Sequence, residues 1–167
     1  MNTLSRAKEL EELRFECRLR ELSFFTPSSS ATRITKVAAT LEALTAGRYV
    51  IGLGPNCGDV IRVGRYPVRL GRHAGVLEES PEGVVDYAIN DASIVGPREV
   101  SRLHATLDPT QCPIDEIQLR DEESSTGTWL YPTMTRVLPA SPSTLRHGSL
   151  FSLGPSTTNL FMMIVRE

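Results

Sequence analysis

The feature that most constrains the fold of this chain is the regular spacing of turn-forming residues from Arg48 onward. Short apolar or alternating segments are separated by Gly, Pro, Asn and Asp at a spacing of roughly ten residues, which is typical of an all-β sandwich. The predicted fold class is therefore mainly β. Strands are expected near Arg48–Leu53, Asp59–Val63, Pro67–Gly71, Asp86–Ile89, Leu103–Leu107, Glu116–Arg120, Thr128–Tyr131, Thr135–Leu138, Ser149–Leu153 and Asn159–Val165.

Two segments of this region have a distinctive pattern. Between Leu103 and Leu107, apolar residues alternate with His104 and Thr106, so one face of that strand is expected to be buried. The stretch 75–100 is the longest irregular piece. Its prolines, glycines and acidic clusters favour an exposed loop that is interrupted by one short strand.

Residues 1–47 differ in composition and periodicity from the rest of the chain. They are predicted to form a helical extension to the β domain, residues 48–167. The first helix, residues 3–25, contains good helix formers and no Gly or Pro. Its apolar side chains form two groups on nearly opposite sides, so this helix can contact two bodies at once or pack on its own domain. A serine-rich linker near residues 26–32, which contains Pro27, ends it.

A second helix, residues 34–46, is predicted from apolar residues that follow the i, i+3, i+4, i+7 rule, with Gly47 in the C-cap position. The apolar residues are Ile34, Val37, Ala38, Leu41 and Leu44. Helices 3–25 and 34–46 are the surfaces proposed for contact with a second protein or for self-association.

The charge balance argues against a general attraction to polyanions. The chain has 18 Lys and Arg against 20 Asp and Glu, a net charge of -2, so neither nucleic acid nor a membrane is an expected partner, and any anion site must be local. The three cysteines lie far apart and form no CxxC pair, so neither a disulfide framework nor a metal site is expected. No stretch resembles a signal peptide or a membrane span, and an intracellular location, cytoplasm or nucleus, fits best.

Three fragments of the β region carry residues suited to an anion site. They are Leu70-Gly71-Arg72, Ser101-Arg102-Leu103-His104-Ala105 and Asp121-Glu122-Glu123-Ser124-Ser125-Thr126-Gly127-Thr128. In this order they resemble the forkhead-associated (FHA) domain family, whose pattern has a Gly-Arg after the third strand, then Ser-Arg-x-His, then Asp-x-x-Ser-x-Asn-Gly-Thr. The segment from His147 to Gly154 resembles the family's closing pattern, so the resemblance covers roughly residues 48–167.

The resemblance implies a β-sandwich of about eleven strands that binds phosphothreonine peptides through the loops at one end. A phosphothreonine carries about -1.5 to -2 charges and three acceptor oxygens, so its pocket needs a permanent cation and several donors. Arg72 would supply the cation and donate two charge-assisted hydrogen bonds to one phosphate. Ser101 would offer its hydroxyl and its backbone N–H, and Arg102 a second positive charge. Ser125 would donate a further hydroxyl.

Other residues of the pattern would support this pocket or modify it. By the same resemblance, Gly71, His104, Gly127 and Thr128 are structural: the ring of His104 would bond to the neighbouring turn, and Gly127 would take a backbone conformation closed to other residues. Thr126 replaces the family's Asn, whose amide holds the peptide backbone. Because a threonine hydroxyl is shorter, phosphate capture is expected to survive while peptide positioning changes.

A second departure from the family is the interval between Arg72 and Ser101, which is longer than usual. This loop is expected to carry a specificity element or to block the pocket. Each arginine or serine taken singly also fits an ordinary surface residue or a turn former, and only their ordered combination favours a site.

The predicted function is a phosphothreonine-dependent interaction module that acts as an adaptor or scaffold in signalling or complex assembly. The alternative is an FHA-fold structural subunit that assembles a multiprotein complex without phosphate dependence. Enzymatic activity and a cofactor are not expected, because the sequence contains no GxxxxGK[ST], HExxH or GxSxG motif. The glycine-rich stretch 52–58 precedes a predicted strand, whereas a dinucleotide loop precedes a helix.

Overall fold

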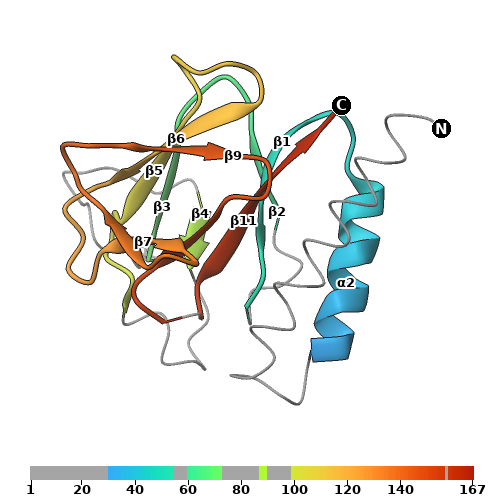
Figure 1. Ribbon diagram of the computed structural model, residues 1–167, viewed down its shortest axis with the longest axis horizontal. Helices are drawn as coiled ribbons and strands as arrows, with labels where there is room; N and C mark the ends of the chain where they lie inside the picture. Colours follow the sequence, from blue (N-terminus) through green and yellow to red (C-terminus); the bar gives the residue numbers. More distant parts are fainter. Residues whose placement is uncertain (1–29, 55–59, 73–86, 90–98, 157) are drawn as a thin grey trace, which may run out of the picture.

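A computed structural model describes residues 30–54, 60–72, 87–89, 99–156 and 158–167. Within these residues one helix is followed by strands that form two facing sheets (Figure 1). The elements are α2 (Ser30–Ala43), β1 (Gly47–Gly52), β2 (Val60–Val63), β3 (Val68–Arg72), β4 (Tyr87–Ile89), β5 (Ala105–Asp108), β6 (Glu116–Asp121), β7 (Thr128–Tyr131), β8 (Thr135–Val137), β9 (Ser143–Arg146), β10 (Leu150–Leu153) and β11 (Leu160–Arg166). The predicted mainly-β sandwich is confirmed.

The six-stranded sheet has the order β2-β1-β11-β10-β7-β8, and the five-stranded sheet has the order β4-β3-β5-β6-β9. The paired strands are antiparallel except for β3 and β4, which run parallel. Strands expected from the sequence lie within one or two residues of their predicted bounds. The sequence missed β9, because this edge strand contributes a single fully buried residue, Leu145, between polar neighbours.

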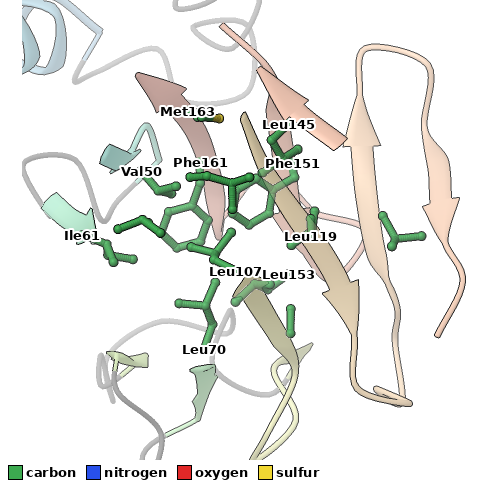
Figure 2. Packing of buried hydrophobic residues seen from close by; sticks show 14 of the residues in the cluster. Val50, Ile61, Leu70, Leu107, Leu119, Leu145, Phe151, Leu153, Phe161 and Met163 are labelled. Carbon is green, nitrogen blue, oxygen red and sulfur yellow. The ribbon is translucent and has the colours of Figure 1, made fainter. Parts of the chain in front are cut away.

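The space between the sheets is filled by large apolar side chains from both layers. Phe151 of β10 and Phe161 of β11 stack with their ring centroids 5.3 Å apart (Figure 2). Leu107 and Leu119 of the five-stranded sheet complete this part of the core, and all four residues are fully buried. Burying one such side chain contributes about 1.5–3 kcal/mol, so this core holds the two sheets together.

A second apolar cluster lies on the outer face of the six-stranded sheet, under α2. Val37 and Leu41 of the helix pack there against residues of β1, β10 and β11. Strand β11 alternates between the two clusters, because Met163 faces the inter-sheet core whereas Met162 and Ile164 face the helix. This double burial explains the continuous apolar run in β11. Helix α2 is therefore packed directly on the sandwich, as Figure 1 shows.

The N-terminal predictions need several corrections. Helix α2 begins at Ser30 and ends at Ala43, so the expected span of 34–46 is shifted and the expected linker near 26–32 overlaps its first turn. Gly47 does not cap the helix but begins β1, with φ at 149°. Ala38, expected on the apolar face, is exposed. The predicted helix at 3–25 lies outside the described residues, and the domain boundary after residue 47 stays a prediction.

Within the described part of the chain, no helix combines the length and the apolar character needed to cross a lipid bilayer.

Candidate functional site

The three sequence fragments meet at one end of the sandwich, where β3 ends, β5 begins and a turn joins β6 to β7. Arg72 is the last residue of β3, and its backbone N–H donates to the carbonyl oxygen of Ser101 at 2.9 Å. The backbone N–H of Ser125, in the β6–β7 turn, donates to the hydroxyl oxygen of Ser101 at 3.0 Å. Ser101 therefore links the fragment of Arg72 to the fragment of Ser125.

Three of the predicted ligand residues are exposed to solvent. The side chain of Arg72 is exposed, and within the described residues its guanidinium has no hydrogen bond or ion pair. Ser125 is also exposed, and its hydroxyl has no partner in the same part of the chain. Ser101 is half-buried, and because its oxygen accepts from Ser125, its own O–H proton remains available to donate. Arg102, beside it, is exposed.

The backbone N–H of Ser101, by contrast, is already engaged. It donates to Nδ1 of His104 at 3.0 Å. The expectation that Ser101 offers this N–H to a ligand is therefore wrong, and the physical reason is that the buried ring needs a donor for its unprotonated nitrogen. Only the hydroxyl of Ser101 is left for an anion.

His104 connects the Ser101 loop to the β6–β7 turn. Its Nδ1 accepts from Ser101, so the ring proton sits on Nε2, which donates to the carbonyl oxygen of Gly127 at 2.9 Å. The side chain is fully buried, and this burial lowers its pKa below the usual 6.5, an effect that the hydrogen bond to Gly127 partly opposes. At neutral pH the ring is uncharged and bridges two backbone segments. The contact with the neighbouring turn expected for His104 is present.

The predicted half-buried pattern of β5 is wrong, because both of its faces are covered. Ala105 and Leu107 face the core as expected, but His104 and Thr106 are buried as well, and Leu103 is only half-buried. Both polar side chains find partners inside the protein: Thr106 donates its hydroxyl proton to Glu122 at 2.6 Å. A polar residue whose hydrogen bonds are satisfied in this way can be buried at little cost.

The β6–β7 turn is held by a buried carboxylate that the sequence reasoning did not single out. Oδ2 of Asp121 accepts hydrogen bonds from the hydroxyls of Ser124, at 2.6 Å, and Thr128, at 2.7 Å, while Oδ1 accepts from the backbone N–H of Ser124. The hydroxyl oxygen of Ser124 accepts the N–H of Gly127. The signal for this frame was the Asp followed by Ser three residues later, a common local turn motif.

Gly127 confirms the predicted backbone requirement, since its φ is 89°. Its carbonyl accepts from His104 and also from the N–H of Gly154, at 2.9 Å. A Cβ atom at this position would lie 2.7 Å from Nε of Arg136, so an added side chain would also displace that arginine. Gly71 is buried in β3, directly before Arg72.

Thr126 is half-buried and already bonded. Its hydroxyl donates to the backbone carbonyl of Glu99, and its own carbonyl accepts the indole N–H of Trp129 at 3.0 Å. The carboxylate of Glu99, a residue that the sequence did not indicate, accepts the hydroxyl of Ser156 at 2.7 Å. Thr126 therefore keeps acceptor lone pairs for a ligand, but its single proton is committed to Glu99.

The two glutamates of the β6–β7 turn differ in their surroundings. Glu122, the first acid of the turn, forms a salt bridge of 2.9 Å with Arg120. Glu123 is exposed at the turn, with φ at 57°. Among the described residues, no three His, Cys, Asp or Glu side chains gather into a metal site. The arrangement is suited to holding an anion between an exposed guanidinium and hydroxyl donors.

Comparison with known proteins gives the same architecture. A model of the FHA domain matches residues 68–154, just over half of the chain. The chain is similar to the FHA domain of the CT664 protein from Chlamydia trachomatis, with 19% identity, a TM-score of 0.51, and 72% of this chain and 98% of that one covered. No curated protein sequence gives a significant match.

Two further solved structures are more distant. One is full-length yeast Pml1p, with 18% identity, a TM-score of 0.49, and 75% of this chain and 89% of that one covered. The other is EmbR of Mycobacterium tuberculosis in complex with a low affinity phosphopeptide, with 19% identity, a TM-score of 0.48, and 82% of this chain but 31% of EmbR covered. At these identities the likeness concerns the fold alone.

Proposed function

This chain belongs to the FHA domain family, and we propose that it binds phosphothreonine in a partner protein through Arg72, Ser101 and Ser125. The observation that carries the proposal is the solvent-exposed guanidinium of Arg72, which has no partner in the described residues, on a backbone bonded directly to Ser101. Ser125 is joined to the same serine by its backbone N–H. The residues that carry one cation and two hydroxyls are thus joined by hydrogen bonds of the backbone.

The chemistry of a phosphorylated side chain fits this set of donors. A guanidinium donates two parallel hydrogen bonds to one phosphate and stays charged at any physiological pH. The hydroxyls of Ser101 and Ser125 add neutral donors to the remaining oxygens. Ser101 is fixed by Arg72, His104 and Ser125, so little order has to be imposed when the ligand arrives.

The role that follows is that of an adaptor or scaffold inside the cell, in cytoplasm or nucleus, whose partner is a protein phosphorylated on threonine. A second partner would bind through residues 3–25 or through α2. Because the apolar side of α2 is covered by the sheet, such a contact would use the exposed side that carries Lys36 and Glu42.

Isothermal titration against a phosphothreonine peptide library, with the unphosphorylated peptides in parallel, tests the proposal. Binding should require the phosphate and should be lost in Arg72→Ala and Ser101→Ala. The matched control is Arg65→Ala, which removes an exposed arginine in the β2–β3 turn, at the other end of the sandwich. If both pocket variants bind like the parent protein, the assigned pocket is wrong.

The second candidate is an FHA-fold structural subunit that assembles a complex without phosphate dependence. The observation in its favour is Thr126, whose hydroxyl proton is used within the domain instead of facing a peptide. If phosphorylation changes no affinity across the library, this candidate replaces the first.

A further inference from the structure

We propose that Arg136 and Trp129 form a second anion subsite, which binds an acidic side chain of the same phosphopeptide that places its phosphate at Arg72. This inference rests on the proposed function and adds to it the chemistry of the peptide. It concerns two residues of the β7–β8 hairpin, Trp129 and Arg136, that lie outside the three sequence fragments.

Trp129 and Arg136 contact each other directly. Trp129 of β7 and Arg136 of β8 are direct cross-strand partners, and Cζ of Arg136 lies 5.8 Å from the centre of the indole ring. The indole N–H is bonded to the carbonyl of Thr126, so the ring itself is fixed. A guanidinium stacked on a fixed aromatic ring is oriented in advance, and its N–H edge stays free to donate to an anion.

This unit lies directly against the turn of the candidate pocket. Nε of Arg136 is 2.7 Å from the point where a Cβ of Gly127 would be, and Gly127 is two residues beyond Ser125. The same glycine is bonded through His104 to Ser101. A peptide that places its phosphate beside Ser101 and Ser125 therefore has Arg136 close by, across one turn of the chain.

The charge of Arg136 is not neutralised within the described residues. Its side chain is exposed and forms no ion pair there. Two acids of this end of the domain have other partners, since Glu99 accepts from Ser156 and Glu122 is paired with Arg120, whereas Glu123 is exposed in the turn. In a protein with a net charge of -2, an exposed arginine with no ion pair among the described residues, beside the proposed phosphate pocket, favours a ligand with a second negative group.

The test is a titration of phosphothreonine peptides in which a single Asp is moved through each of the five positions on either side. The parent protein should prefer one position by roughly threefold to fivefold over the Ala peptide, the range of an exposed charge pair. A phosphoserine at that position should give a larger gain than Asp, since it carries more charge. Arg136→Ala should remove both gains while still binding the Ala peptide.

The chain offers a matched control for this substitution. Arg62 stacks on Tyr49 in the same cross-strand manner, 5.9 Å from the ring centre, but pairs β2 with β1 away from the turn. Arg62→Ala should keep the preference for the acidic peptide. Arg136→Gln keeps an aliphatic side chain with a polar end group but removes the charge, so it serves as a second variant if Arg136→Ala fails to fold. Thermal melts of all variants measure their stability.

The outcomes separate this inference from the proposed function. If the parent protein binds no phosphopeptide, the proposed function fails, and the subsite fails with it. If phosphopeptides bind but Asp is neutral at every position, or Arg136→Ala and Arg136→Gln keep the preference, the subsite is wrong while the proposed function stands.

Discussion

Two adjacent serines show how the site end of the sandwich is divided. Ser124 is 6% exposed and is hydrogen-bonded to both oxygens of Asp121, whereas Ser125 faces solvent with its hydroxyl unused within the described residues. Ser124 belongs to a buried frame with Asp121, Thr128 and His104. Ser125 belongs to an exposed rim with Arg72 and Ser101. The frame is expected to govern folding and the rim to govern binding.

The largest effect is expected from Asp121→Ala in the frame. This substitution leaves three donors of Ser124 and Thr128 without an acceptor. The free energy of unfolding should fall by about 3 kcal/mol or more. Urea denaturation followed by the fluorescence of Trp129, the single tryptophan, measures it. Asp115→Ala, at an exposed acid, should change stability by less than about 0.5 kcal/mol, and a similar value for Asp121→Ala would contradict the frame.

Arg72→Ala in the rim is expected to weaken binding strongly and to leave stability almost unchanged. Removal of the guanidinium should weaken phosphopeptide binding by about 100-fold, or about 2.7 kcal/mol, with an unfolding free energy within about 0.5 kcal/mol of the parent value. Arg72→Lys should recover part of the affinity, because lysine keeps the charge but loses the paired geometry. Titration calorimetry and urea denaturation on the same samples give both quantities. A large stability loss in Arg72→Ala would place Arg72 in the frame.

The serine pair gives the sharpest version of the comparison, because both changes remove one hydroxyl. Ser124→Ala should lower the unfolding free energy by about 1–2 kcal/mol, since it leaves the N–H of Gly127 without an acceptor. Ser125→Ala should leave stability unchanged and weaken phosphopeptide binding by roughly fivefold to tenfold, the net value of one typical hydrogen bond, about 1–1.4 kcal/mol. If the two variants behave alike, the division into frame and rim is wrong.

The smallest effect is a pH dependence of folding that comes from His104. Because burial lowers its pKa below 6.5, the native state binds fewer protons than the unfolded state as the pH falls through that value. The contribution of neutral His104 to the free energy of unfolding is therefore fully present above pH 6.5. It decreases as the pH falls below this value, with a slope of at most about 1.4 kcal/mol per pH unit. Urea denaturation at several pH values measures this slope. In His104→Gln, which cannot titrate, this part of the slope should be absent, and an unchanged slope would contradict the assignment.

Much of the fold follows from local pattern. The alternation of residues within each strand and the glycines and prolines between strands located every strand of the sandwich except β9. Leu145 is the only large apolar residue of β9, so the segment carries no alternation to detect. The predicted end of α2, at residue 46, lies beyond the observed end at Ala43, where the chain turns toward the sheet. Tyr49 of β1 donates its hydroxyl to the carbonyl of Thr45, which fixes the chain between helix and strand.

The sequence pointed to all three residues of the rim as candidates, but it pointed to only part of the frame. Arg72, Ser101 and Ser125 stand in an ordered pattern of residue types, so the sequence was sufficient to group them as candidates. Which hydroxyl faces inward and which outward is not visible in that pattern, since Ser124 and Ser125 are chemically identical. The role of Glu99 was missed because its contacts with Thr126 and Ser156 join segments that are far apart in the sequence. Asp121 stands in the third fragment, but nothing in the pattern distinguishes its buried carboxylate from the exposed acid Glu123.

Local sequence was enough to predict the sandwich, because periodicity and turn chemistry are short-range properties of the chain. The ordered fragments were enough to name candidate residues for a phosphate site. Which of those groups remain available to a ligand depends on tertiary contacts. The tertiary structure commits the N–H of Ser101 to His104 and the proton of Thr126 to Glu99, and it brings Arg136 against Gly127. The contacts of Glu99 and Arg136 join different strands and loops, so they depend on how the sheets pack, which no local stretch of sequence encodes.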